Sequence, residues 1–264
     1  MINLKVTTIQ SDLHWENVNA NLNMFAEKIA LITDETDIIV LPEMFNTGFS
    51  MNSEKLAEAM DGKTIVWMKA QAKKSNAVIV GSLIVKENKN YYNRLVWVLP
   101  DAEILTYDKR HLFRMAGEHN YFTAGTERII IEYKGWRICP LICYDLRFPV
   151  WTRNVSDNQN PAYDCLIYIA NWLAARKAPW NKLLEARAIE NQCYVVGVNR
   201  IGVDGTEKPY CGNSVVINPK GEPILTIPEN ENYIATTNLS LDQLNDFRKV
   251  FPVGMDGDDF EIIL

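Results

Sequence analysis

Hydrophobic positions follow two periodicities along the chain, and their alternation predicts strands interleaved with helices. Short runs rich in Val and Ile predict strands over 4–10, 37–41, 77–85, 165–170, 194–200 and 233–239. Apolar residues spaced three and four positions apart predict helices over 15–32, 64–74 and 178–192. Ser240 and Gln243 have the spacing of a capping box, which predicts a further helix over 241–250.

Three pairs of strand-like runs are joined by short turns, which predicts antiparallel hairpins. The pairs are 91–100 with 103–108, 129–133 with 136–142, and the two halves of 214–227. Hairpins among alternating helices and strands favour an α/β fold with a mixed sheet. No low-complexity linker or internal repeat divides the sequence, so we expect one domain over 1–264 with enough strands for two sheets.

The composition argues against several classes of function. The 264 residues are 47% apolar and 23% charged, as in ordinary globular proteins, and the net charge is -6. An acidic chain without a basic block is unsuited to nucleic acid or anionic membranes. The first ten residues do not resemble a secretory signal, and no apolar run approaches the roughly 20 residues of a membrane span. We therefore expect a cytoplasmic protein with no nucleic-acid partner and no membrane partner.

The cysteines and histidines do not have the spacing of a metal site. The five cysteines are scattered without a CxxC pair, and most lie in or beside apolar runs, which is typical of buried reduced thiols. None of the histidines, His14, His111 and His119, has zinc-like spacing with a cysteine. We expect neither a metal nor an organic cofactor.

Two predicted strands lead into charged residues. Glu43 follows strand 37–41 in the sequence LPEMF, where open α/β sheets bind ligands at their carboxyl edge. Lys109 lies in YDKRHLF, where Leu112-Phe113 anchors the loop in the core. Each residue also fits a plainer interpretation, a solvated loop carboxylate for Glu43 and a surface charge cluster for Lys109.

A third strand, 136–142, ends at Cys143 in the sequence ICPLICYDLRFP. A thiol at a turn from strand to helix is exposed near amide groups that lower its pKa and stabilise an oxyanion. The alternative, a buried structural cysteine, fits Cys139 better because Cys139 lies within the strand among apolar neighbours.

These three blocks, in this order, resemble the nitrilase superfamily of carbon–nitrogen hydrolases. The resemblance extends from TIQSDLHWENVNANL to YIATTNL and includes ANW at 170–172 and the segment 183–202. It implies a four-layer α-β-β-α sandwich with two mixed sheets, assembled as a homodimer or a larger even homo-oligomer.

The resemblance also implies roles for four residues. Glu43 matches the general base, Lys109 the cation and Cys143 the nucleophile, while Glu118 is similar to a second glutamate beside the nucleophile. A loop carboxylate is the alternative for Glu118. The block YDLRFP with the later ANW is most similar to the omega-amidases, which hydrolyse the terminal amide of 2-oxoglutaramate and 2-oxosuccinamate. The expected partner is thus a small-molecule amide substrate.

Amide hydrolysis through Cys143 requires donors for an oxyanion, and we expect these to be Lys109 and the backbone N–H of Tyr144. A carboxylate on the substrate requires a cation, for which Arg147 and Arg176 are candidates. Trp172 is a candidate for the pocket wall. A salt bridge from Arg147 to Asp145 or to another acidic residue is the structural alternative.

Other functions remain open on the sequence. Nitrile or N-carbamoyl hydrolysis would use the same three residues, and a binding member of the fold would have lost catalysis. A cysteine–histidine hydrolase would instead use His111 or His119 to activate Cys143.

Overall fold

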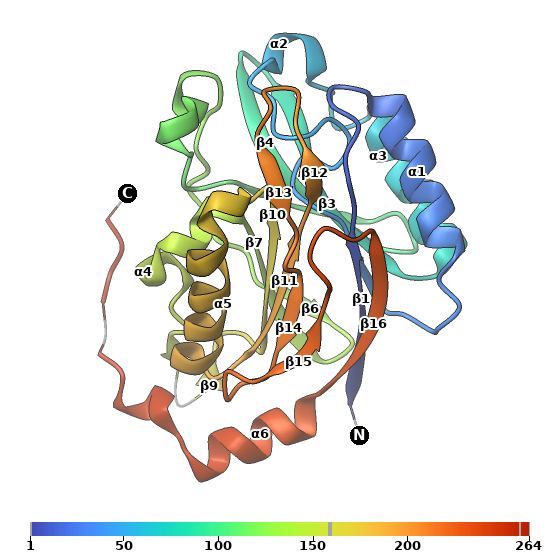
Figure 1. Cartoon of the computed structure of the whole chain (residues 1–264). Coiled ribbons are helices and arrows are strands. Elements are labelled where there is room, and N and C mark those ends of the chain that lie inside the picture. Colours follow the sequence, from blue (N-terminus) through green and yellow to red (C-terminus); the bar gives the residue numbers. More distant parts are fainter. Residues whose placement is uncertain (1, 158–159, 259, 264) are drawn as a thin grey trace.

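Two six-stranded sheets face each other, and helices cover their outer faces (Figure 1). The computed structural model describes residues 2–157, 160–258 and 260–263. The first sheet contains β1 (Asn3–Gln10), β2 (Ile38–Val40), β3 (Val78–Glu87), β4 (Asn90–Val98), β5 (Ile104–Asp108) and β16 (Tyr233–Ser240). The second contains β6 (Ile131–Tyr133), β7 (Trp136–Ile142), β10 (Cys165–Ala170), β11 (Tyr194–Asn199), β14 (Val215–Ile217) and β15 (Pro223–Thr226).

Shorter elements connect these strands. The helices are α1 (Val18–Ala30), α2 (Ser53–Leu56), α3 (Lys63–Ser75), α4 (Pro149–Thr152), α5 (Lys177–Asn191) and α6 (Leu241–Val250). The 3₁₀ turns are η1 (Arg114–Ala116), η2 (Glu118–Asn120), η3 (Cys143–Arg147), η4 (Ala174–Arg176) and η5 (Val253–Asp256). Two small ribbons pair β8 (Ser156–Asp157) with β9 (Asn160–Pro161) and β12 (Ile201–Val203) with β13 (Pro209–Cys211).

Both sheets are mixed and have the same arrangement of strands. The strand orders are β16-β1-β2-β3-β4-β5 and β6-β7-β10-β11-β14-β15. In each sheet three neighbouring strands are parallel to one another. One strand pairs antiparallel with them on one side, and two strands follow on the other side, each antiparallel to its neighbour. The carboxyl ends of parallel strands carry the loops that bind ligands in α/β sheets, so each half contributes such an edge.

The alternation of side chains along each strand separates the layers. Val40 and Val80 belong to the core between the sheets, whereas Ile39 and Ile79 pack with α1 and α3 on the outer face of the first sheet. Helix α5 covers the second sheet, and α6 lies across the end of the molecule beside β16 (Figure 1). The expected four-layer sandwich with two mixed sheets is confirmed.

The long predicted elements are confirmed, with shifted ends. The first helix begins at Val18 rather than at residue 15, because the Asn17 side chain caps it by accepting from the Ala20 N–H at 3.1 Å. At the last helix Ser240 Oγ accepts from the Gln243 N–H, but the Ser240 N–H donates to Tyr194 Oη, so only half of the capping box forms. The ribbons and the four-residue helices were not predicted, since they are too short to show a period.

In the part of the chain described here, we find no helix whose length and apolar character suit it to crossing a bilayer.

Gly81 on β3 provides a test of the outer layer. A Cβ atom at this position would lie 2.7 Å from Cδ1 of Phe45, whose fully buried ring packs edge-on against Phe25. We predict that Gly81→Ala lowers the free energy of unfolding by about 1–3 kcal/mol through overpacking. Urea unfolding measures this change, with Gly257→Ala as the control, since its nearest neighbours lie at 3.4 Å. Equal stability of the two variants would contradict the packing described here.

Candidate active site

Three loops at strand ends converge at one place between the sheets. Glu43 follows β2, Lys109 follows β5 and Cys143 follows β7. The loop after β2 is fixed against β3, where the Met44 N–H donates to Ser82 Oγ at 2.8 Å and the Phe45 N–H donates to the Ser82 carbonyl at 3.1 Å. Glu43, Lys109 and Cys143 are far apart in sequence, but the fold brings them close together.

Lys109 lies between two carboxylates. Its Nζ atom donates to Glu43 Oε1 at 2.8 Å and to both carboxylate oxygens of Glu118 at 3.0 Å. The lysine is 1% exposed and neither glutamate is exposed. A buried charge requires such pairing, which excludes the plainer interpretations of Glu43, Glu118 and Lys109 as surface groups.

Two asparagines complete the cluster. Asn93 Nδ2 on β4 donates to Glu43 Oε1 at 2.8 Å and to Glu118 Oε1 at 3.3 Å, so one amide bridges both carboxylates. The Asn171 N–H, just after β10, donates to Glu43 Oε2 at 2.8 Å, and its side chain donates to the Glu43 carbonyl. Glu43 is therefore held by groups from both sheets.

Burial and charge act in opposite directions on this cluster. Burial alone would lower the pKa of Lys109, but the charges of Glu118 and Glu43 outweigh it and raise that pKa. Burial raises the pKa of Glu118, while the Lys109 ammonium opposes the rise. Both Glu118 oxygens accept hydrogen bonds, from Lys109, from Asn93 and from the Phe113 N–H at 2.5 Å. None of these partners is an acceptor for a carboxyl proton, so the geometry favours the ionised carboxylate.

Cys143 begins the 3₁₀ turn η3 with a backbone φ of 43°. This left-handed conformation is strained for a residue with a side chain and is common where a loop presents a reactive group. The thiol is 8% exposed and lies on the pocket wall, whereas Cys139 is fully buried within β7.

The electrostatic environment of Cys143 favours the protonated thiol. Burial raises the pKa of Cys143 well above its ordinary value, and the charge of Glu43 and a hydrogen bond to it add to this effect, while Lys109 opposes it. The prediction that nearby amide groups lower this pKa is wrong, because burial and the adjacent carboxylate dominate. Ionisation of the thiol thus requires an acceptor for its proton, and Glu43 is in place.

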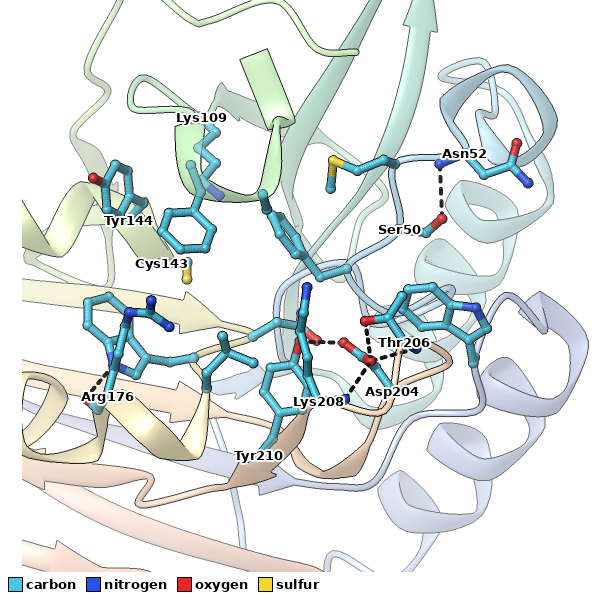
Figure 2. A pocket seen from close by; sticks show the side chains of 18 of the residues that line it. Ser50, Asn52, Lys109, Cys143, Tyr144, Arg176, Asp204, Thr206, Lys208 and Tyr210 are labelled. Carbon is cyan, nitrogen blue, oxygen red and sulfur yellow. Dashed lines mark hydrogen bonds between the residues drawn. The ribbon is translucent and has the colours of Figure 1, made fainter. Parts of the chain in front are cut away.

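A pocket of about 390 Å³ opens above Cys143 and Lys109 (Figure 2). Aromatic side chains form much of its wall, including Trp15, Phe49, Phe113, Tyr144 and Trp172. Asn171 and the two arginines predicted to bind a carboxylate, Arg147 and Arg176, also line the pocket. All eight predicted site residues are therefore at the cluster or on the pocket wall.

The two arginines differ in their surroundings. The Arg147 guanidinium lies 4.9 Å from the ring centre of Trp172 and, within the described residues, has no ion pair or hydrogen bond. Arg176 Nη2 donates to Met115 Sδ at 2.8 Å, and its guanidinium lies over Phe113. The alternative salt bridge from Arg147 to Asp145 is absent, because the Asp145 oxygens accept from other groups.

Neither candidate histidine of the rival mechanism lines this pocket. His111 Nδ1 lies 2.8 Å from Asp145 Oδ1 and its ring stacks on Phe148, while His119 is exposed beside a different surface hollow. Among the described residues there is also no group of three His, Cys, Asp or Glu side chains arranged to hold a metal ion.

Several residues of the site were not predicted from the sequence. Asn93 lies within a strand with no local signal, and Asn171 was noted only as part of the ANW segment. The β12–β13 ribbon brings Asp204, Lys208 and Tyr210 to the pocket, where Asp204 accepts from the Lys208 N–H and from Tyr210 Oη (Figure 2). Their contribution depends on pairing between distant segments.

Comparisons with known proteins agree with this fold. The family model of the carbon–nitrogen hydrolases matches residues 5–249. An Escherichia coli (strain K12) omega-amidase, YafV, is 46% identical over 99% of this chain and 100% of its own length. A Bacillus subtilis 2-oxoglutaramate amidase is 32% identical, covering 94% of this chain and 95% of its own length.

A solved structure extends the similarity to three dimensions. XC1258 from Xanthomonas campestris, described as a CN-hydrolase superfamily protein, superimposes with a TM-score of 0.97 at 40% identity, covering 99% of this chain and 100% of that one. The chain belongs to the carbon–nitrogen hydrolase family of the nitrilase superfamily, and it is an amidase that acts on non-peptide carbon–nitrogen bonds.

Opposite substitutions test the electrostatics of Cys143. Glu43→Gln removes a charge that raises the pKa of Cys143, so we predict a fall of about one pH unit or more. Lys109→Met removes a charge that lowers this pKa, so we predict a rise. The pH dependence of Cys143 alkylation by iodoacetamide, followed by peptide mass spectrometry, measures both against the wild type. A shift in the same direction in both variants would refute the assignment.

Proposed function

We propose that this protein hydrolyses the terminal amide of a small omega-amidodicarboxylate such as 2-oxoglutaramate, releasing the dicarboxylate and ammonia. The observation that carries the proposal is the buried Glu43–Lys109–Glu118 cluster beside Cys143. On the wall of the same pocket lies the Arg147 guanidinium, which makes no ion pair within the part of the chain that the structure describes. The activities after which the E. coli and B. subtilis relatives are named support the choice of substrate.

The first half of the reaction forms a thioester. Glu43 accepts the proton of the Cys143 thiol as the sulfur attacks the amide carbon, which gives a tetrahedral oxyanion. Lys109 Nζ and the Tyr144 N–H donate to this oxyanion, and each such donor is commonly worth about 3–4 kcal/mol in the transition state. The carbon–nitrogen bond then breaks, and Glu43 returns the proton to the departing ammonia.

The second half regenerates the enzyme. Glu43 removes a proton from a water molecule that attacks the thioester carbon, and the carbon–sulfur bond breaks with return of that proton to the Cys143 thiolate. Glu118 keeps Lys109 in place and charged through both steps, because it binds the ammonium with both oxygens. Glu43 thus passes the thiol proton of Cys143 to ammonia and replaces it with a proton from water, so both residues end in their starting states.

Arg147 is the residue that binds the substrate carboxylate in this proposal. Within the described residues its guanidinium has no ion pair or hydrogen bond, and the planar fork suits bidentate binding of a carboxylate. Trp172 supports the guanidinium from one face through its ring. Arg176 is a second cation near the pocket mouth and already contacts Met115.

We also propose that the chain acts as one domain in the cytoplasm and assembles as a homodimer through its helices. Val150 on α4 and Ile189 on α5 are 57% and 55% exposed, which suits an apolar contact between copies. All five cysteines are free, as expected in a reducing compartment. Light scattering of the purified protein measures the oligomeric state, and a monomer would contradict the dimer.

Ammonia release tests the proposed function. We predict that the wild type turns over 2-oxoglutaramate faster than glutamine, a simple nitrile or an N-carbamoyl amino acid, and that Cys143→Ala has no activity. Preference for another substrate with the same dependence on Cys143 would contradict the substrate assignment. Activity in Cys143→Ala would contradict the nucleophile, and inactivity of the wild type on every amide would favour a binding protein.

The contribution of Arg147 is testable with a matched control. Loss of a charge-assisted hydrogen bond costs about 1.5–3 kcal/mol, so we predict that Arg147→Gln lowers kcat/KM for 2-oxoglutaramate roughly tenfold to hundredfold. Turnover of pentanamide, which has no carboxylate, stays unchanged. Arg114→Gln removes an exposed arginine outside the pocket and serves as the control. A selective loss in Arg176→Gln instead would assign the carboxylate to Arg176.

A further inference from the structure

Asp145 is a fully buried carboxylate that accepts four hydrogen bonds. One oxygen accepts from Tyr107 Oη at 2.8 Å and from the Ile142 N–H at 3.0 Å. The other accepts from the His111 N–H at 3.0 Å and lies 2.8 Å from His111 Nδ1. Asp145 does not line the pocket, so its carboxylate interacts with other groups of the protein rather than with a bound substrate.

The donors to Asp145 belong to the two loops that carry Lys109 and Cys143. Tyr107 and His111 stand two residues before and two residues after Lys109. Ile142 immediately precedes Cys143, and Asp145 itself lies two residues after it on η3. One carboxylate therefore ties the lysine loop at two points to the turn that presents the thiol.

The tautomer of His111 follows from this contact. An ionised carboxylate only accepts hydrogen bonds, so the contact with Asp145 requires a proton on Nδ1 of His111. The ring is stacked on Phe148 with a centroid distance of 3.7 Å and lies edge-on to Trp151. His111 is thus fixed as part of the connection between the loops.

We propose that Asp145 is a positioning residue, which sets the distance between the Cys143 sulfur and the Lys109 ammonium through Tyr107 and His111. This inference rests on the proposed function, because it assumes that the sulfur and the ammonium act on the same carbonyl group. Its effect belongs to the chemical step, since a displacement of about 1 Å between reacting groups is sufficient to cost about a hundredfold in rate. Substrate affinity depends on the pocket wall, to which Asp145 does not contribute.

Asp145→Asn tests this role with almost no change in shape. The amide nitrogen cannot accept from Tyr107 Oη and Ile142, or alternatively from His111, so one of the two attachments between the lysine loop and η3 is lost. We predict that kcat for 2-oxoglutaramate falls about a hundredfold while KM changes less than threefold. Unchanged kcat, or a change confined to KM, would overturn the proposal.

Asp164→Asn is the matched control for a merely structural role. Asp164 is also a buried aspartate, and it accepts from Arg137 and Arg248 away from the pocket. We predict that this variant lowers Tm but keeps kcat within twofold of the wild type. If kcat falls in both variants, and by the same factor for the same loss of Tm, the effect of Asp145→Asn is a general loss of stability and the proposal is overturned.

Tyr107→Phe provides the test if Asp145→Asn does not fold. It removes the hydrogen bond to Asp145 and those that Tyr107 Oη accepts from Trp151 Nε1 and from the Arg110 N–H, and we predict a fall in kcat of about tenfold at constant KM. Wild-type kcat in this variant would overturn the proposal. If wild type does not hydrolyse 2-oxoglutaramate, the proposed function fails separately. Asp145→Asn must then still change the rate of Cys143 alkylation by iodoacetamide, and an unchanged rate overturns the positioning role.

Discussion

The Lys109 ammonium is buried between two carboxylates, and most of the described site depends on this arrangement. Removing one partner from such a group costs about 3–5 kcal/mol, because the remaining charge is left in a medium that solvates it poorly. Asn93 and the Phe113 N–H satisfy further lone pairs of the two glutamates. The charges of the cluster are therefore stabilised only when all of its members are in place. This mutual dependence makes the cluster rigid before any substrate binds.

The repeated strand order of the two sheets brings this cluster together. The first sheet supplies Glu43 and Lys109, and the second supplies Cys143 and Asn171, whose N–H reaches across to Glu43. Burial and the adjacent carboxylate raise the pKa of Cys143, which favours the protonated thiol, and in the proposed reaction Glu43 accepts that proton. The fold thus couples formation of the nucleophile to the same carboxylate that returns a proton to ammonia in the proposed reaction.

The sequence was sufficient to predict the elements and residues whose signals are local. The apolar run of β2 ends three residues before Glu43 and that of β7 directly before Cys143, and the long helices show their period within a few turns. Asn93 was missed because nothing near it in sequence distinguishes it, and its importance comes from Glu43 and Glu118, which the fold places beside its amide. The sequence suggested Asp145 as a partner of Arg147, but the Tyr107 hydroxyl and the His111 N–H donate to Asp145 instead. Contacts between distant segments decide such cases, and one sequence does not contain them.

The most direct test of the central claim is rapid-quench mass spectrometry of the wild-type protein during turnover of 2-oxoglutaramate. Mixing for milliseconds, quenching in acid and digesting the protein identifies any residue that carries the acyl group. We predict a transient increase in mass equal to the oxo-acyl group on the peptide that contains Cys143, which decays as substrate is exhausted. Ammonia release without this adduct, or an adduct on another cysteine such as Cys211, would contradict nucleophilic catalysis by Cys143.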